Sequence, residues 1–368
     1  MMNKMIVANL VHRPLRSLIS IVAIALEVTL ILLIVGLSLG MLNDSRARQA
    51  GIGADVIVMP PGSSFIVGLT GAPMSIKVGG LLAKLPHVVA VAPVVTHVSA
   101  SGALEVIAGI DLQSYESLSG PFHFVEGGPF QGANDVLVDD LFARSKHVNV
   151  GDTIEVLNNN FRVAGIVEQG KGARKFLPIG VLQDLIGAKD KASIFYLKLD
   201  DPSNADAVVD EIKKVPGMEK YVATSMAYYL SMMTPSNYPG LSTFINLVIG
   251  ISVIIGFIVI FQAMYTAVME RTREIGILKS MGASKLYIVN VILRETVLLA
   301  IGGIVVGIVF SLAARLGIVR RVPTLPVVVT AGWMLRAAII AIIGAIAGAV
   351  YPAYKAAQKD PIDALAYE

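Results

Sequence analysis

The chain alternates between long apolar runs and stretches of mixed polarity, and this pattern predicts a membrane protein. A helix needs about 20 mostly apolar residues to cross the hydrocarbon core of a bilayer. Four runs reach that length, so four transmembrane helices are predicted. The first run follows a basic segment, as in a signal peptide, but its length and the lack of an A-x-A-like exit favour an uncleaved anchor. The predicted helices cover residues 18–41, 241–269, 291–317 and 331–351.

Residues 42–240 lie between the first two predicted spans and have the composition of a soluble domain. Short β-branched runs alternate there with polar turns, which predicts strands, and helices are predicted at 139–144 and 204–214. The three asparagines at 158–160 predict a hairpin turn, because Asn tolerates left-handed backbone. The strands are expected at 55–59, 88–95, 103–109, 153–157, 161–167 and 194–199. The predicted fold class is therefore an α-helical membrane protein with four transmembrane helices and an α+β extracytoplasmic domain inserted between helices 1 and 2.

Basic residues flank the predicted spans unevenly, and the positive-inside rule uses that bias to orient the chain. Both the N-terminal segment 1–17 and the tail 352–368 are basic next to a span, so both termini and the loop 270–290 are expected in the cytoplasm. The protein is then a multi-pass protein of the cell (inner) membrane. One loop disagrees with this orientation, because three arginines at 315–321 lie beside the short external loop 318–330. The basic residues of the other loops favour the orientation given above, and we follow them. The basic residues near the termini are Lys4, Arg13, Arg16, Lys355 and Lys359.

Composition supports the membrane assignment and excludes several classes of function. Of the 368 residues, 55% are hydrophobic and 15% are charged, and the mean hydropathy of +0.70 is well above a soluble average. The net charge of +3 is small and dispersed, so no nucleic-acid partner is expected. Cysteine is absent, which excludes disulfides and thiolate metal sites. No HExxH spacing occurs and no nucleophile elbow is expected, so neither a catalytic nor a metal site is predicted.

A charged, helix-prone segment separates the second and third spans and reads MERTREIGILKSMGASKLYIVN from 269 to 290. Helix formers predict a helix over 269–281, Gly282 supplies a stop, and Ser284 caps a new helix that continues into the third span. Such a short amphipathic helix can simply lie on lipid headgroups. Its apolar side is expected to carry Ile275, Ile277 and Leu278, and its polar face Glu270, Arg271, Arg273, Glu274 and Lys279.

The wording ERTREIGILKSMGASKLYIVNVILRE closely resembles the same loop in the MacB and FtsX-like family of ATP-binding-cassette (ABC) transporter permeases. The opening NLVHRPLRSLISIVAIALEV, the hairpin GDTIEVLNNNFRVAGIVE and the closing YPAYKAAQKDPIDALAYE fit the same family, so the resemblance runs nearly end to end. The size of the external domain is similar to the stand-alone DevC and haem-exporter type. In this family the loop forms a coupling helix that docks into a groove on a cytoplasmic ATPase. The resemblance implies that this ATPase is contacted by Glu270, Arg271, Arg273, Glu274, Ile275, Leu278 and Lys279.

The resemblance also sets the expected partners. No segment reads GxxxxGK[ST], the loop that cradles nucleotide phosphates, so ATP and Mg are expected on a separate ABC ATPase subunit, with no cofactor bound by this chain and no enzyme activity of its own. In MacB the ATPase is fused to the N-terminal side of the membrane half. In this sequence about 17 residues precede the first predicted span. Four spans offer too little wall to enclose a route, so a homodimer with eight spans and two ATPase subunits is expected. Membrane lipid is a further partner, and a periplasmic adaptor a further candidate.

Glu27 lies near the centre of the first predicted span, where an ionised carboxylate costs roughly 2.5 to 3.5 kcal/mol on insertion scales. Two interpretations stay open: a protonated carboxyl hydrogen-bonded to a neighbouring helix, or two copies that line a dimer interface and touch the substrate. Gln262, Met264 and Tyr265 are weaker substrate candidates, since such residues are ordinary at helix interfaces. Pairs of glycines four residues apart predict close helix packing at Gly303, Gly307, Gly344 and Gly348.

Three functions fit these patterns. The first is an export permease that transmits ATPase motion through the coupling helix and expels a hydrophobic or amphipathic substrate. The second is an FtsX-like signalling subunit, in which the same motion activates an external cell-wall hydrolase. The third is a membrane scaffold without coupling, which the specific wording of the loop disfavours.

Overall fold

A computed structural model describes residues 14–63, 73–99, 105–238 and 240–359. The chain divides into two compact units, which are treated separately below. One unit comprises residues 1–39, 241–320 and 327–368, and the other comprises residues 40–240 and 321–326. The first contains the predicted spans, and the second contains the predicted external domain.

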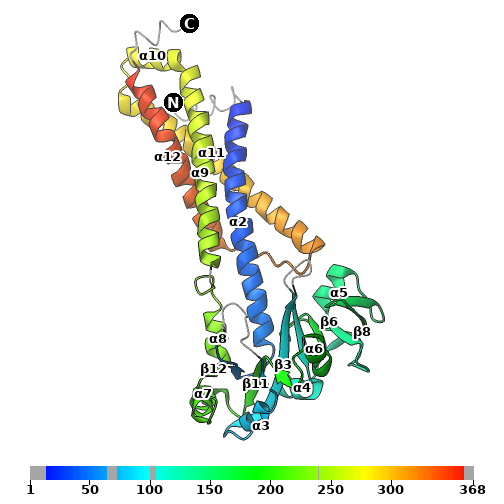
Figure 1. Cartoon of the computed structure of the whole chain (residues 1–368). Helices are drawn as coiled ribbons and strands as arrows, with labels where there is room; N and C mark the ends of the chain where they lie inside the picture. Colours follow the sequence, from blue (N-terminus) through cyan, green and yellow to red (C-terminus); the bar gives the residue numbers. More distant parts are fainter. Residues whose placement is uncertain (1–13, 64–72, 100–104, 239, 360–368) are drawn as a thin grey trace. The chain divides into compact units, whose positions relative to one another are not determined.

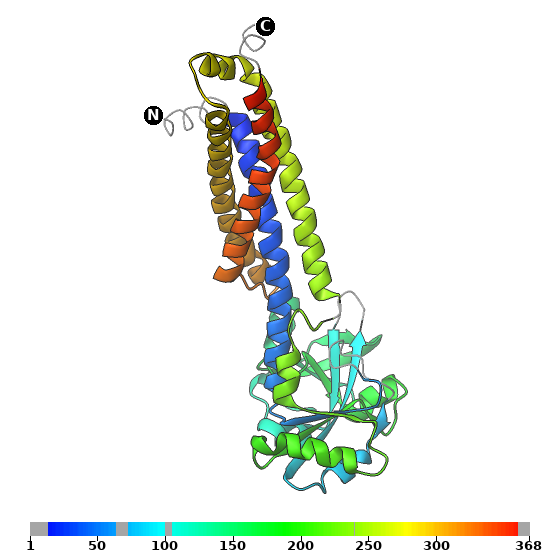
Figure 2. The same ribbon diagram turned by 90° about the vertical axis from the view of Figure 1, so that its left-hand side faces the viewer.

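The four long helices confirm the predicted membrane-spanning segments, since each is long and apolar enough to cross a bilayer (Figures 1 and 2). They are α2 (Pro14–Ala50), α9 (Leu241–Glu270), α11 (Lys285–Arg321) and α12 (Ala331–Gln358), and the short α10 (Thr272–Ser280) lies between α9 and α11. Three of the long helices run past the predicted spans, because hydropathy registers only the apolar part of a helix. The polar sequence after Met41 contains good helix formers, so α2 continues to Ala50.

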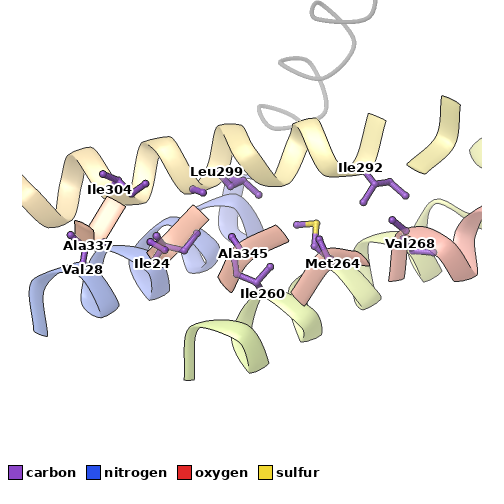
Figure 3. Packing of buried hydrophobic residues seen from close by; sticks show 14 of the residues in the cluster. Ile24, Val28, Ile260, Met264, Val268, Ile292, Leu299, Ile304, Ala337 and Ala345 are labelled. Atoms are coloured by element: carbon purple, nitrogen blue, oxygen red, sulfur yellow. The ribbon is translucent and has the colours of Figure 1, made fainter. Parts of the chain in front are cut away.

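Side chains from all four long helices meet in one apolar core (Figure 3). Ile24 of α2, Ile260 of α9, Leu299 of α11 and Ala345 of α12 point into it and are buried. The face that α12 contributes is made of alanines four residues apart, which fall in line because a helix turns once every 3.6 residues. Without side-chain bulk, the backbones of α12 and α9 approach closely. The buried alanines are Ala337, Ala341, Ala345, Ala349, Ala353 and Ala357.

The four glycines predicted to favour packing lie in two different environments. A Cβ on Gly303 would stand 2.6 Å from Ile24 Cβ, and one on Gly307 would stand 2.7 Å from Ala25 O, so α11 meets α2 backbone to backbone there. Gly348 approaches α9 in the same way, with Phe257 O 2.9 Å from its Cβ position. Gly344 has ordinary room, because the nearest atoms to its Cβ position are 3.9 Å away.

The second unit is built on a ten-stranded mixed sheet in the order β12-β1-β11-β3-β4-β9-β6-β8-β5, with β7 paired to β8. Neighbouring strands are antiparallel except for β4 with β9 and β6 with β8. A second sheet pairs β10 (Lys191–Ala192) with β2 (Met74–Ser75). The strands of the main sheet are β1 (Val56–Met59), β3 (Val88–Ser99), β4 (Glu105–Ile110), β5 (Phe124–Gly127), β6 (Asp135–Asp139), β7 (Thr153–Val156), β8 (Asn159–Val167), β9 (Lys175–Pro178), β11 (Ile194–Leu199) and β12 (Val222–Ser225).

Short helices pack on this sheet and close its apolar clusters. On the amphipathic α7, for example, Val208 and Ile212 are buried together with Val56 of β1. The helices are α3 (Val78–Leu82), α4 (Leu112–Ser119), α5 (Asp140–Lys146), α6 (Ile179–Leu185), the 3₁₀ turn η1 (Pro202–Asn204), α7 (Ala205–Lys214) and α8 (Met226–Met232). The α+β class predicted for this domain is confirmed.

Each of the six predicted strands and both predicted helices corresponds to an element of the structure, within a few residues, apart from 103–104, which fall outside the described residues. The hairpin turn was misplaced. Val156 pairs with Asn159, so the two turn residues are Leu157 and Asn158, which have φ of 53° and 61°. A two-residue turn of this hand matches the twist of the strands, and it therefore forces even a leucine into left-handed backbone. Asn159 and Asn160 belong to β8.

The sequence did not predict β6, because aspartates stand at both of its ends. Asp135 has a side chain that is 4% exposed and accepts hydrogen bonds from the backbone N–H groups of Gln131 (2.6 Å) and Gly132 (2.9 Å). The Arg162 guanidinium donates to the same carboxylate from Nε (3.1 Å) and Nη2 (2.9 Å). Burial by itself raises the pKa of Asp135, but these donors outweigh it and hold the pKa below its usual value.

Replacing Asp135 by Ala should lower the free energy of unfolding by about 2 to 3 kcal/mol, since two backbone N–H groups and the Arg162 guanidinium lose a buried charged acceptor. Thermal unfolding of the purified full chain measures this loss. The exposed Asp210→Ala, which breaks only a surface pair with Lys213, is the control and should change stability by less than about 0.5 kcal/mol. Because the folded pKa of Asp135 is lowered, its contribution is present above the unfolded pKa and is lost as pH falls through the folded pKa. Equal losses in both variants would contradict the assignment.

Candidate functional site

The segment between α9 and α11 is a helix bounded by two breaks. The predicted helix over 269–281 is wrong at its start, since the chain leaves the helical conformation at Arg271 (φ −105°, ψ 15°) before α10 begins. At the other end, Gly282 has φ +96°, a conformation that favours glycine, and the Ser284 hydroxyl accepts a hydrogen bond from Tyr287 N at 3.2 Å. The predicted glycine stop and serine cap are confirmed. Figures 1 and 2 show α10 lying across the end of the bundle.

The break at Arg271 accompanies a buried ion pair. Arg271 Nη1 lies 3.0 Å from Glu295 Oε2 and 3.3 Å from Oε1, and the two side chains are only 12% and 4% exposed. Arg271 was predicted on the exposed polar face of the helix, and this prediction is wrong. The guanidinium turns inward because Glu295, nearly three helical turns into α11, offers it a charged partner in a low-dielectric setting. No local sequence spacing signals this pair, since the residues are 24 positions apart.

The far end of α10 is held by a second charged side chain. Lys279 Nζ donates to Ala357 O at 2.9 Å and also to Lys359 O, at the end of α12. The last carbonyls of a helix lack partners within the helix, and a lysine there also complements the helix dipole. Lys279, like Arg271, therefore fixes α10 to its own chain, in contrast to the predicted exposed position. The helix is thus attached to α11 at its start and to α12 at its end.

A mixed charged and apolar surface is left on the outer side of α10. Glu270, Arg273 and Glu274 are exposed as predicted, while Ile275 is buried and Leu278 packs on the bundle core. Ile277 was predicted on the apolar side and instead is 43% exposed. Beyond it, Met281 and Leu286 are 72% and 81% exposed, although neither was singled out from the sequence. Exposed apolar side chains ringed by charges are the composition of a protein docking surface.

A cavity of about 310 Å³ borders α10, and the partly exposed Glu274 and Ile277 are among the residues that line it. Its walls are apolar residues of α9, α10 and α11, and the Arg271–Glu295 pair borders it. A space of this kind leaves α10 incompletely packed against the bundle, so the two charged attachments carry much of what holds the helix in place.

Glu27 occupies a different position from either interpretation of the sequence. The residue is 3% exposed, and its carboxyl lies in the bundle against Gly256 of α9, where a Cβ would overlap Oε2. Among the residues that the structure describes, Glu27 Oε1 has no hydrogen-bond partner, and the same holds for Ser20 Oγ, two turns earlier on the same face of α2. The carboxyl therefore faces this chain's own helices, and within the described part of the chain its Oε1 does not make the predicted hydrogen bond.

Two short sequences match a catalytic or a nucleotide-binding motif, one at every position and the other at all but one. Neither has the geometry that its motif requires. GLSLG at 36–40 reads GxSxG, but Ser38 lies inside α2 and donates to Ile34 O at 2.9 Å, whereas a nucleophile elbow needs a strand-to-helix turn. GIVEQGKG at 165–172 has glycine in place of the hydroxyl residue of a P-loop, and it leads from β8 into β9 with no helix after it. Neither segment supports catalysis.

Removal of one member of the Arg271–Glu295 pair should lower the free energy of unfolding by up to about 3 to 5 kcal/mol, because the other charge stays buried and loses this partner. Arg271→Ala and Glu295→Ala, measured by thermal unfolding in detergent, should each show this loss, and the double variant should lose less than their sum. Additive losses would mean that the two side chains do not interact.

Gly256→Ala should destabilise the bundle, since the added methyl group overlaps the carboxyl of Glu27. The compensating variant Gly256→Ala with Glu27→Ala removes the overlap and should recover most of the loss, about 1 to 3 kcal/mol of overpacking. Melting temperatures of the two variants and of Glu27→Ala alone decide this. A double variant less stable than Gly256→Ala would show that the carboxyl lies elsewhere.

The sequence matches two family models. The MacB-like periplasmic core domain matches residues 17–215, and the FtsX-like permease C-terminal domain matches residues 246–361. Two solved domains also align with the chain. The periplasmic region of MacB from Actinobacillus actinomycetemcomitans aligns over 50% of this chain and 94% of the MacB region, at 17% identity and a TM-score of 0.39. The extracellular domain of the ABC-type transporter YknZ from Gram-positive bacteria does so over 46% and 98%, at 14% identity and a TM-score of 0.35.

Similar full-length proteins include ABC transporter proteins from several bacteria. The macrolide export ATP-binding/permease protein MacB of Shewanella sp. (strain W3-18-1) is 26% identical over 388 residues, which cover 97% of this chain. The ABC transporter permease YknZ of Bacillus subtilis (strain 168) is 28% identical over 266 residues, which cover 67%. The chain spans 59% of the length of the former and 63% of the latter. Since the core-domain model covers more than half of the sequence, the chain belongs to the MacB and FtsX-like family of ABC transporter permeases.

Proposed function

We propose that this chain is the permease of an ABC exporter, and that α10 is the coupling helix through which a cytoplasmic ATPase drives it. The observation that carries this proposal is the double attachment of α10, by Arg271 to α11 and by Lys279 to the end of α12. A docked helix can transmit motion to the transmembrane helices only if it is firmly attached to them. The same helix leaves Arg273, Glu274 and Ile277 exposed for a partner.

The charges and the apolar residues on that surface have different roles in the proposed docking. Exposed charged residues such as Arg273 and Glu274 set orientation and encounter rate, whereas apolar anchors supply most of the affinity. The exposed apolar groups available for this are Ile277 on α10, Met281 at its C-terminal end and Leu286 at the start of α11. When the ATPase subunits close on ATP, a docked α10 moves with them, and its two attachments carry the displacement to α11 and α12.

ATP and Mg are proposed to bind on the ATPase, with this chain binding neither. The 368 residues contain no GxxxxGK[ST] sequence, so the phosphate-binding loop must come from outside them. The family resemblance supports an ABC ATPase as the partner. With the positive-inside bias, α10 and both termini lie in the cytoplasm of a cell whose inner membrane holds the four spans.

A homodimer is proposed from the outer apolar faces of the bundle. Apolar residues at helical spacing stay exposed on α2, and α9 has a similar face that includes Ile251 and Ile258. Such faces suit lipid or a second copy of the chain, and two copies would supply eight spans. The exposed α2 residues are Leu15, Leu18, Ile19, Val22, Leu26 and Leu30.

The proposed substrate is hydrophobic or amphipathic. A groove of about 640 Å³ lies between the start of α2 and α9. Most of its lining residues are apolar, and the polar ones include Gln262 and Glu270. Such a mixture suits a molecule with an apolar body and a polar end. Glu27 would reach a substrate only where α2 separates from α9, since Gly256 covers its carboxyl in this structure.

The test is ATP hydrolysis by the permease reconstituted in lipid nanodiscs with the ATPase that co-purifies with it, screened against haem, macrolides, lipopeptides and lipoproteins. Stimulation by one class of compound is expected. Arg273→Glu combined with Ile277→Asp should weaken ATPase association and stimulated turnover at least about tenfold, as expected for loss of central docking residues.

Lys213→Glu, on the exposed side of α7, is the matched charge-reversal control and should leave turnover unchanged. Stimulation by an external protein alone, with no compound effective, would overturn export and favour the signalling function. Full turnover in the α10 double variant would remove the coupling role from this helix.

A further inference from the structure

A second cavity lies wholly within the external unit and is separate from α10 and Glu27. Its volume is about 460 Å³, and it is bordered by the end of α2, β4, α5, β9 and the segment 321–326. Basic and acidic side chains line one part, while Met41, Val106 and Leu325 are among the apolar residues of the other. A cavity with both kinds of wall fits a ligand that has both kinds of surface.

Most of the charged groups in this cavity neutralise one another. Asp44 pairs with Arg48 one helical turn along α2 and with Arg174 at 2.9 Å, and Arg174 also reaches Asp139 at 2.8 Å. On the β4 side, Lys175 Nζ lies 2.5 Å from Glu105 Oε2 and 4.5 Å from the centre of the Phe142 ring. These pairs fix the charged wall in place and use up its acidic groups.

One lysine at the cavity is left over. Lys146, in the last turn of α5, lines the cavity, is exposed, and makes no hydrogen bond or ion pair with any residue in the described part of the chain. Four basic side chains, Arg48, Lys146, Arg174 and Lys175, thus face three acidic ones, Asp44, Glu105 and Asp139. Among the described charged side chains at the cavity, Lys146 therefore supplies the surplus positive charge and is available to bind an anion.

The apolar part of the lining is left uncovered. Met41 and Val106 are 52% and 45% exposed, although both lie at the cavity. Met41 ends the first predicted apolar run, and Val322 is the first residue after α11, so two borders of the cavity directly follow membrane-spanning sequence. The cavity is therefore adjacent in sequence to segments that can span a bilayer, which is where an amphiphile inserts.

We infer that this cavity binds an anionic amphiphile, with the anionic head at Lys146 and the apolar chain along Met41, Val106 and Leu325. The inference rests on the proposed function only where it treats the bound molecule as the exported substrate. In that case it narrows the class of substrate from hydrophobic or amphipathic molecules to anionic amphiphiles. Ligand binding by the permease alone requires neither the ATPase nor export.

The lack of cysteine in the native chain allows a direct binding test. Val106→Cys places a single thiol at the cavity, and its modification by uncharged N-ethylmaleimide is followed in full-length permease in phosphatidylcholine nanodiscs. Dodecyl phosphate, dodecylphosphocholine and dodecyltrimethylammonium share a tail and differ in the charge of the head. Dodecyl phosphate should slow modification several-fold and saturably, at a concentration at least about tenfold below that of the cationic compound, as expected for a charge-assisted contact.

Two further variants separate charge recognition from nonspecific effects. Adding Lys146→Glu should raise the concentration of dodecyl phosphate needed for half-protection about tenfold, and because Lys146 has no partner among the described residues, the melting temperature should not change. Val125→Cys, exposed on β5 and outside the cavity, is the matched thiol and should be modified at the same rate with and without ligand.

The outcomes assign the source of the ligand or overturn the inference. Protection by phosphatidylglycerol placed in the nanodisc, without added amphiphile, would identify a membrane lipid, and protection only by added dodecyl phosphate would identify a dissolved amphiphile. Equal protection by the anionic and cationic compounds, or none by either, would overturn the inference. ATPase stimulation that survives such a result would leave the exporter function intact and place its substrate site elsewhere.

Discussion

The buried pair of Arg271 and Glu295 is the contact on which the proposed coupling depends. An arginine at a helix break would ordinarily extend into water, and its inward turn joins α10 to the third span. A buried ion pair contributes little net stability compared with apolar packing, but breaking one is costly because a lone charge stays behind. In the proposed coupling, the pair is the fixed contact between α10 and α11, and a cavity borders it.

The rest of the bundle is held by close contacts between helix backbones, as the proposed coupling requires. Alanines four residues apart bring α12 onto α9, and Gly303 and Gly307 bring α11 onto α2. Small residues leave little side-chain freedom between the helices, so displacement of one helix is passed to its neighbour. Lys279 adds the end of α12 to the elements that α10 contacts. Each helix of the bundle is thus linked, directly or through one neighbour, to the coupling helix.

The helix α2 has a second role, since it belongs to both units. Up to Leu39 it packs in the bundle, and from Gly40 it is part of the external unit, where Asp44 and Arg48 join the network of Arg174 and Asp139. Asp44 and Arg48 of α2 also line the proposed amphiphile cavity, which lies within the external unit.

The sequence by itself determined the elements of this protein whose physical cause is local. Hydropathy sets the four spans, β-branched runs set six of the strands, and Gly282 and Ser284 set the end of α10 and the start of α11. Tertiary structure decided the features that depend on partners far along the chain. The strand β6 was missed because Asp135 and Asp139 look like surface residues until Arg162 and Arg174 are placed beside them. Arg271 and Lys279 looked like parts of an exposed face because Glu295 and the last carbonyls of α12 are distant in sequence. Periodicity tells which side of a helix is polar, but only the fold tells which charges find a buried partner, since pairing energy depends on distance and local dielectric.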